Sequence, residues 1–294
     1  MDTHSPGRPV SVSTRLRLAA QYSFRVLRGH IDATIVPLPN GRVLRRTAFG
    51  HYMVVDMQDS MLAPALAVDG YWELATALAF RSLLSSDDTL LEVGCNIGYY
   101  TLLAAMKLKR EGAIVSFDAN EKVIETARDS LRYNGALRTA TLIHSAVSDS
   151  VGTVTFQRMT KSAATSTLYH YSGDDFPVPD ETPEFVEVPC TTLDTWCEEH
   201  NFRPSIIRID AEGAEAAIFR GMPKLLQDQH LRKVVFEYCP EHLIRAGVEP
   251  ASILTALTDA GFALYEIDSL GGLLRREVSE IQNMALADVV GLRS

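Results

Sequence analysis

Between residues 71 and 292, short apolar runs alternate with longer amphipathic stretches, and this alternation constrains the fold more than any other feature of the sequence. Expected strands occupy residues 89–93, 113–117, 140–147, 205–209, 233–238, 262–267 and 287–292, and expected helices residues 71–84, 99–109, 121–134, 214–227 and 250–260. Strands that alternate with helices form parallel βαβ units. The sequence therefore predicts an open, Rossmann-like α/β sheet with helices on both faces, which binds ligands beyond the carboxyl ends of its strands.

The residues before this pattern predict a small N-terminal cap. Residues 1–13 are rich in Ser, Pro and Thr and are expected to be disordered. The expected cap elements are a helix at residues 14–28 and strands at residues 31–36, 42–46 and 51–57. The dipeptide Asn40-Gly41 between the first two strands is typical of a hairpin turn. We therefore expect a helix-and-strand cap at residues 14–69 and a larger domain at residues 70–294.

The alternation is interrupted around residues 158–187 by a small, polar and Pro-rich segment between two strand-like runs. In a compact domain, a loop of this length is usually a lid, a binding loop or a disordered insertion. We expect a substrate loop here, with a floppy insertion as the alternative.

The charge of the chain limits its partners. Its 294 residues carry a formal net charge of -9, which argues against a nucleic-acid-binding protein, because such proteins usually have a basic surplus. The helix expected at residues 14–28 is different, since it carries four arginines among apolar residues. Such a helix can lie on an anionic membrane, although packing on its own domain or on a second copy of a homo-oligomer is the more ordinary arrangement.

The chain also lacks several signals that would place it elsewhere in the cell. No apolar run is long enough to span a bilayer, and the start does not resemble a secretory leader. Four cysteines are present, without the spacing of a structural zinc site. We therefore expect a cytoplasmic protein with reduced thiols.

The stretch LLEVGCNIGYYT at residues 90–101 indicates a cofactor site at the end of the first strand of the sheet. Glu92 ends that strand, and Gly94 and Gly98 lie in the turn that opens the next helix. A dinucleotide fingerprint counted from Gly94 needs glycine at positions 96 and 99, where this chain has Asn96 and Tyr99. The turn therefore favours S-adenosylmethionine (SAM), which has no phosphates and whose cationic part suits a nearby carboxylate, over NAD.

A second acidic residue, Asp118, follows the next strand. A carboxylate at that position can accept both ribose hydroxyls of a nucleoside, although it can also cap the helix that begins near residue 121. Ser145 and Ala146 follow the third strand, where an adenine edge would lie. The predicted cofactor-binding residues are Glu92, Gly94, Cys95, Asn96, Gly98, Tyr99, Asp118, Ala119, Asn120, Ser145 and Ala146.

Several stretches, in this order, resemble the FkbM-type SAM-dependent methyltransferases of the class I fold: TLLEVGCNIGYYTLLAA, SFDAN, LRYNG, HSAVSD, VPCTTLDTW, IIRIDAEGAEAAIFRGM and VVFEY. The resemblance covers roughly residues 70–267, and the IDAEGAE block is its most specific element. It implies cofactor roles for Glu92, Gly94, Asn96, Gly98 and Asp118. Asp118 stands where the family more often has Glu, which shortens the reach to the ribose. The resemblance also implies O-methylation of a hydroxyl on a sugar, a glycolipid or a polyketide-like product.

Carboxylates that follow two later strands are candidates for the chemistry. Methyl transfer to an alcohol requires alignment and removal of the hydroxyl proton. Asp210 and Glu237 end neighbouring strands and could meet in one cleft, with Glu212 and His242 a few residues further on. These four are the predicted catalytic residues. Glu212 and also Glu215 could instead stabilise a helix N-terminus, and His242 could be a surface histidine.

A metal is an alternative to a side-chain base. Asp210 and Glu237 could hold Mg²⁺, which would lower the pKa of the acceptor hydroxyl. Among nearby aromatics, Tyr99 is the predicted stacking residue, whereas Trp72 and Tyr100 are expected in the core or in subunit contacts.

The leading interpretation is an O-methyltransferase acting on a hydroxyl of a sugar, glycan or natural product. Three alternatives remain: an N- or C-methyltransferase acting on a small molecule, a methyltransferase-like scaffold without turnover in glycan assembly, and an NAD oxidoreductase. The intact Glu92, Gly94, Gly98 and Asp118 argue against the scaffold, and Asn96 and Tyr99 argue against NAD.

Overall fold

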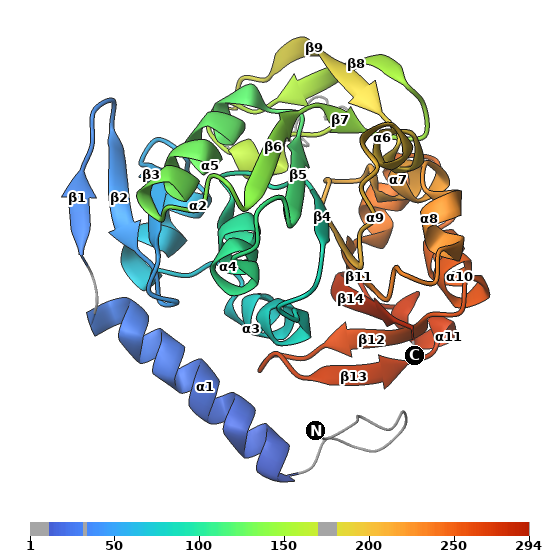
Figure 1. Ribbon diagram of the computed structural model, residues 1–294, viewed down its shortest axis with the longest axis horizontal. Helices are drawn as coiled ribbons and strands as arrows, with labels where there is room; N and C mark the ends of the chain where they lie inside the picture. Colours follow the sequence, from blue (N-terminus) through green and yellow to red (C-terminus); the bar gives the residue numbers. More distant parts are fainter. Residues whose placement is uncertain (1–11, 32–33, 170–180, 294) are drawn as a thin grey trace.

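The computed structural model describes residues 12–31, 34–169 and 181–293, and its main feature is an eight-stranded central sheet (Figure 1). The strand order is β13-β12-β14-β11-β10-β4-β5-β6. The strands are β4 (Leu90–Val93), β5 (Ile114–Asp118), β6 (Ala140–His144), β10 (Ile206–Ile209), β11 (Lys233–Tyr238), β12 (Ala263–Ile267), β13 (Leu273–Arg276) and β14 (Ala287–Leu292). Residues 1–11, most of the segment expected to be disordered, lie outside the described residues.

The predicted Rossmann-like α/β sheet is confirmed, although part of it is not parallel. Strands β6, β5, β4, β10 and β11 are parallel neighbours. Strand β14 is inserted antiparallel between β11 and β12, and β13, which the sequence did not predict, pairs antiparallel with β12. The chain leaves β4 toward β5 and β6 on one side and reaches β10 and β11 on the other. This reversal of strand order between β4 and β10 is where an open α/β sheet binds its ligands.

Helices flank the sheet on both faces. One face is covered by α3 (Leu74–Leu83), α4 (Tyr99–Leu108) and α5 (Glu121–Tyr133). The other is covered by α6 (Leu193–His200), α7 (Glu215–Arg220), α8 (Pro223–Gln227), α9 (Pro240–Arg245), α10 (Ala251–Asp259) and α11 (Val278–Ile281). The single helix predicted at residues 214–227 is two helices, because Gly221 and Pro223 separate α7 from α8.

Successive strand residues point to opposite faces, and this alternation builds two apolar cores. Leu90 and Ile206 belong to the core under α3–α5, whereas Leu91 and Ile207 belong to the core under α6–α11. On the α4 side, three adjacent strands place polar side chains next to one another. Register pairs Arg208 of β10 with Glu92 of β4, and Glu92 with Ser116 of β5.

The N-terminal elements pack against the helices of the first face. They are α1 (Val12–Ile31), the antiparallel strands β1 (Ile35–Pro37), β2 (Arg42–Arg46) and β3 (Tyr52–Asp56), the short α2 (Leu62–Pro64) and the π-helix η1 (Ala65–Asp69). The predicted hairpin is confirmed, with positive φ at Asn40 (62°) and Gly41 (72°). Tyr52 exchanges two backbone–side-chain hydrogen bonds with Asn134, the C-cap residue of α5. The division of the chain at residue 70 stays a prediction. No helix among the described residues combines the length and the apolar character needed to cross a bilayer.

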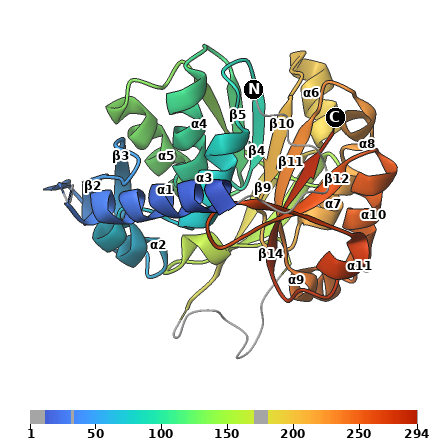
Figure 2. The same ribbon diagram turned by 90° about the horizontal axis from the view of Figure 1, so that it is seen from below.

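The insertion forms part of a second small sheet and contacts the N-terminal segment. This sheet has the order β7-β9-β8 and comprises β7 (Ala146–Val147), β8 (Gly152–Arg158) and β9 (Glu184–Thr191), and a 3-10 turn, η2 (Ala163–Thr165), follows β8. The single strand predicted at residues 140–147 is thus divided between β6 and β7. The Ser60 N–H donates to the carbonyl of Lys161 (2.8 Å), and the Ala163 N–H donates to the Asp59 carboxylate (3.1 Å). Residues 170–180 of the expected substrate loop lie outside the described residues (Figure 2).

Candidate functional site

A cavity of about 270 Å³ lies at the carboxyl ends of β4, β5, β10 and β11, beside the switch in strand order. Its walls come from three parts of the chain. The loops after these strands form the floor, the insertion contributes Ala163, Ala164, Ser166 and Leu168, and the N-terminal region contributes Met61, Leu62, Leu66, Trp72 and Glu73. The expected cap and the described start of the expected substrate loop therefore both reach the site.

The glycine turn is required by close packing of the chain around the site. A Cβ on Gly94 would lie 1.6 Å from the carbonyl oxygen of Asp210, and a Cβ on Gly98 would lie 2.8 Å from the Cβ of Ala127 in α5. Both glycines have positive φ, at 78° and 82°. Gly94 lines the cavity, whereas Gly98 caps the start of α4 and does not line it.

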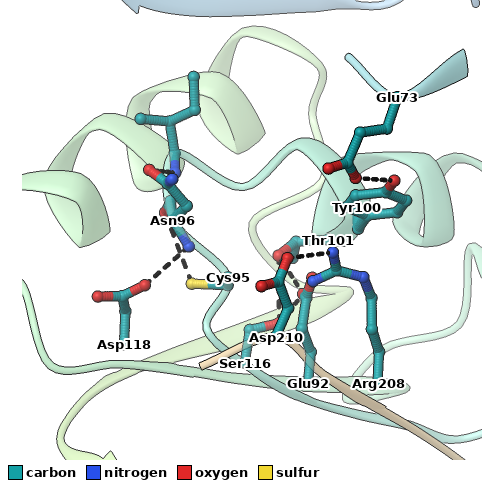
Figure 3. A network of polar contacts seen from close by, with 11 residues as sticks. Glu73, Glu92, Cys95, Asn96, Tyr100, Thr101, Ser116, Asp118, Arg208 and Asp210 are labelled. Carbon is teal, nitrogen blue, oxygen red and sulfur yellow. Dashed lines mark hydrogen bonds and ion pairs between the residues drawn. The ribbon is translucent and has the colours of Figure 1, made fainter. Parts of the chain in front are cut away.

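Asp118 lies on the cavity wall with its carboxylate held by the backbone. The Asn96 N–H donates to Oδ2 (Figure 3) and the Asn120 N–H donates to Oδ1, both at 2.8 Å. Burial raises the pKa of Asp118 to about 6. The side-chain oxygen of Asn120 accepts from the Lys122 N–H (3.1 Å) and caps α5. The capping role considered for Asp118 thus belongs to Asn120, whose side chain does not line the cavity.

Glu92 corrects one expectation, because its carboxylate does not reach the cavity. Alternation along β4 turns it toward α4, where it is fully buried. It accepts hydrogen bonds from Thr101 Oγ1 (2.5 Å) and Ser116 Oγ (2.8 Å), and its Oε1 lies 3.6 Å from Nη1 of Arg208. Burial raises its pKa. Glu92 therefore belongs to the ion network beneath the site.

Arg208, which the sequence analysis missed, is the centre of that network. Its side chain is 6% exposed, and its Nη2 lies 2.8 Å from Oδ2 of Asp210. The guanidinium also lies 3.7 Å from the ring centroid of Tyr100, a cation–π contact (Figure 3). The available signal was an arginine inside the apolar run IIRI, since a buried cation needs a buried partner.

A carboxylate cluster lines the side of the cavity opposite Asp118. It contains Glu73, Asp210, Glu212 and Glu237. The other three carboxyl groups have raised pKa values, mainly because they are buried and secondly because the negative charge of Asp210 lies nearby. The pKa of Glu73 is raised to about 7, that of Glu237 to about 9, and that of Glu212 well above its ordinary range. Asp210 differs from the others because it is paired with Arg208.

Glu73 was not predicted and comes from the N-terminal side of the chain. It caps α3 with a left-handed backbone (φ 40°), and its Oε2 accepts a hydrogen bond from the Tyr100 hydroxyl (2.9 Å). Tyr100 belongs to the core under α3–α5 and Trp72 packs against it, as expected. Both also line the cavity, as does Tyr99.

Two other residues near the carboxylate cluster lie outside the cavity wall. Both oxygens of Glu215 accept backbone N–H bonds, from Ala211 (2.8 Å) and Gly213 (2.9 Å), so this side chain fixes the loop after β10. His242 on α9 does not line the cavity. Its Nδ1 lies 4.0 Å from Oε2 of Glu212, and burial lowers its pKa. The geometry therefore places His242 behind Glu212 and off the cavity wall.

The other predicted cofactor residues are brought together. Cys95, Asn96, Ala119, Ser145 and Ala146 all line the cavity. In the part of the chain that the structure describes, no group of three or more His, Cys, Asp or Glu side chains is placed to hold a metal ion. The arrangement of Asp210 and Glu237 thus gives Mg²⁺ no support.

Together, the sheet, the switch point and the cavity beside a glycine turn define a Rossmann-like α/β protein with a cofactor-type site. A family model described as the methyltransferase FkbM domain matches residues 92–264. The chain belongs to the FkbM methyltransferase family and is a SAM-dependent methyltransferase. A search of curated proteins found no match.

Solved structures of methyltransferases are similar at a distance. Precorrin-6y C5,15-methyltransferase from Geobacter metallireducens GS-15 is 13% identical, covering 76% of this chain and 88% of that one, with a TM-score of 0.39. The Pyrococcus abyssi tRNA (uracil-54, C5)-methyltransferase, in complex with S-adenosyl-L-homocysteine, is 11% identical over 86% of this chain and 44% of its own, with a TM-score of 0.43. A TehB-like SAM-dependent methyltransferase from Corynebacterium glutamicum is 12% identical, covering 79% of this chain and 93% of that one, with a TM-score of 0.41. These similarities are too distant to indicate an acceptor.

Proposed function

We propose that this enzyme methylates a hydroxyl oxygen of a sugar, a glycan or a related natural product. The observation that carries the proposal is that one cavity combines two different groups of residues, which form its two halves. A glycine turn with Asp118 forms one half, and Asp210 paired with buried Arg208 forms the other, beside Glu73 and Glu237. Carboxyl groups at several positions are well suited to bind an acceptor with several hydroxyls, since each can accept or donate hydrogen bonds.

The residues around Asp118 fit SAM. Each Asp118 oxygen accepts one backbone N–H bond and has a lone pair left for a ribose hydroxyl. Ala119, Ala146, Val147, Phe156 and Leu168 give the adjoining wall an apolar surface suited to adenine. Bound SAM supplies a methyl group activated by a positively charged sulfur.

The proton of the acceptor hydroxyl has to be taken up by the protein, and we assign this role to Asp210. The guanidinium of Arg208, 2.8 Å away, stabilises negative charge on Asp210. Burial and the nearby charge of Asp210 raise the pKa of Glu237, which favours its protonated form, and that form would donate a hydrogen bond to the acceptor. Asp210 is thus the group suited to accept the proton, while Glu237 and Glu73 orient the hydroxyl.

Calorimetric titration with SAM, S-adenosylhomocysteine and NAD tests the cofactor half. We expect the two sulfur nucleosides to bind and NAD not to bind. Asp118→Ala should weaken SAM binding by about tenfold to a hundredfold, the value of hydrogen bonds to a charged group. The exposed Asp87→Ala serves as the matched control and should bind like the wild type. An affinity for SAM that is the same in both variants would remove Asp118 from the site.

The acidity of the cavity favours one second candidate, an amine acceptor. Among the described residues, Glu73, Asp118, Asp210, Glu212 and Glu237 line the cavity, and the one cationic side chain on its wall is Arg208. A cationic amine would stabilise the ionised carboxylates. Transfer of a labelled methyl group to polyols and to primary amines, compared side by side, separates the candidates. Transfer to amines alone would replace the hydroxyl proposal.

A further inference from the structure

Helix α1 carries an apolar stripe that the rest of the described chain does not cover. Leu16, Ala20, Phe24 and Leu27 are spaced by four, four and three residues, which places them on one side of a helix. Leu16, Phe24 and Leu27 are 65%, 55% and 58% exposed. A contiguous exposed apolar surface of this kind usually marks an interaction site.

The opposite side of α1 is fixed to the protein, so the stripe is held outward. Tyr22 and Val26 pack against the core under α3–α5. The Arg25 guanidinium donates to the carbonyl of Ala48 (3.0 Å) and lies 4.8 Å from the ring centroid of Phe49. Figures 1 and 2 both show α1 lying along the outside of the molecule.

The charge of α1 is opposite to that of the whole chain. Residues Val12–Ile31 contain no Asp or Glu, whereas the chain carries a net charge of -9. Arg15 and Arg17 are exposed beside the stripe. An apolar stripe of Leu and Phe beside arginines, on a helix without acids, has the composition of helices that lie in the interface of anionic membranes.

We propose that α1 docks this methyltransferase on an anionic membrane surface. Leu16, Phe24 and Leu27 would enter the acyl boundary, and Arg15 and Arg17 would contact lipid phosphates. Charge complementarity favours this occupant over a second copy of the chain. A two-fold dimer through α1 would bring together two helices that carry arginines and no Asp or Glu, and like charges at an interface are unfavourable.

Vesicle flotation of the full chain tests the proposal. The probes are vesicles of phosphatidylcholine alone and of phosphatidylcholine mixed with phosphatidylglycerol. We expect binding to the mixed vesicles, lost at high salt, and none to the neutral ones. The triple variant Leu16→Gln, Phe24→Gln, Leu27→Gln should lose more than about tenfold in affinity, because three large side chains no longer leave water. Replacing Arg15 and Arg17 by Gln should cost about fivefold for each arginine.

A matched control changes three exposed apolar residues outside α1. Val151, Ile244 and Leu286 are 64%, 64% and 61% exposed, and their replacement by Gln should leave vesicle binding unchanged. Absence of binding to anionic vesicles, or an equal loss in the control, would overturn the proposal. So would concentration-dependent self-association in sedimentation velocity that the α1 variant loses and the control keeps, because a second copy would then cover the stripe.

Discussion

Asp118 and Asp210 both follow parallel strands at one edge of the sheet, yet the protein holds them in different ways. Asp118 is fixed by two backbone N–H groups, from Asn96 and Asn120. Asp210 is fixed by the side chain of Arg208, which also faces Glu92. The proposed cofactor half of the cavity, around Asp118, is therefore built into the course of the backbone. The proposed acceptor half, around Asp210, depends on a side-chain ion network that one substitution can remove.

This difference predicts different sensitivities in the two halves. A backbone N–H group cannot be deleted by changing a side chain, so the turn around Asp118 should tolerate changes in its neighbours. In the acceptor half, a buried cation is shared among several carboxyl groups, so loss of the cation affects all of them together.

The largest effect is expected for Arg208→Met. Breaking a buried ion network by removing one partner costs about 3–5 kcal/mol, because the remaining charge stays buried without compensation. We expect a loss of this size in the free energy of unfolding, measured by urea denaturation at neutral pH, together with loss of methyl transfer. Glu92 is fully buried, so it is the partner left uncompensated.

The double variant Arg208→Met, Glu92→Gln separates folding from chemistry. It should regain part of the lost stability, because no unpaired charge remains at position 92. It should not regain turnover, since Asp210 still lacks its cation. A single variant as stable as the wild type would mean that Glu92 is already protonated in the folded protein.

Asp210→Asn should lower turnover with little effect on SAM affinity. Loss of a general base lowers the rate by about 10²–10⁴-fold. The affinity for SAM should stay within a few-fold of the wild type in calorimetry. The matched control is Asp288→Asn, because Asp288 accepts from Thr76 Oγ1 (2.5 Å) and does not line the cavity. Unchanged turnover in Asp210→Asn with loss in Glu237→Gln would move the base to Glu237.

The buried carboxyl groups predict an unusual dependence of stability on pH. Burial raises the pKa of Asp118 to about 6, of Glu73 and Glu215 to about 7, and of Glu237 to about 9. The unfolded chain releases these protons near pH 4, so between pH 4 and 9 these four carboxyl groups bind more protons in the folded state than in the unfolded state. Stability therefore falls as the pH rises through this window.

Urea unfolding of the ligand-free protein at pH 5.5 and 8.5 measures this effect. We expect a lower free energy of unfolding at pH 8.5, by more than about 1 kcal/mol, the value of a single unit of pKa shift. Glu237→Gln should flatten the dependence. Carboxyl groups with lowered pKa values, such as Asp228, lose their contribution only below pH 4 and do not interfere. Stability that rises with pH in this window would contradict the burial argument.

The sequence predicted the half of the cavity around Asp118 better than the half around Asp210. The first half is held by the local backbone, whereas the second is held by side chains from distant parts of the chain. The glycine turn, the position of Asp118 and most strands are local patterns, and the structure has them where the sequence placed them. The exceptions are residues 31–36, where β1 begins only at Ile35, residues 140–147, which are divided between β6 and β7, and β13, which was not predicted. Arg208 and Glu73 were missed because their roles depend on register between strands and on a segment far away in the chain. The position of Glu92 beneath the cavity follows from alternation along β4, since its neighbour Leu91 faces the opposite core.

The antiparallel part of the sheet was also beyond the sequence patterns. The direction of β14 depends on how the chain returns to the sheet after α11, and apolar periodicity carries no information on direction. The same limit applies to the acceptor half, because Trp72 and Glu73 reach the cavity only through the packing of α3 against α4.

The smallest effect, and the sharpest test of the backbone-held half, is expected for Asn120→Ala. The sequence predicted a cofactor role for Asn120, whereas its side chain caps α5. Loss of the cap should cost about 1 kcal/mol in unfolding, and Asn120→Asp, which keeps a capping oxygen, should cost little. Because the N–H that holds Asp118 belongs to the backbone, SAM affinity should be the same in all three proteins. A loss of affinity in Asn120→Ala as large as that in Asp118→Ala would restore the cofactor role and show that the side chain, and not only the backbone, completes this half of the site.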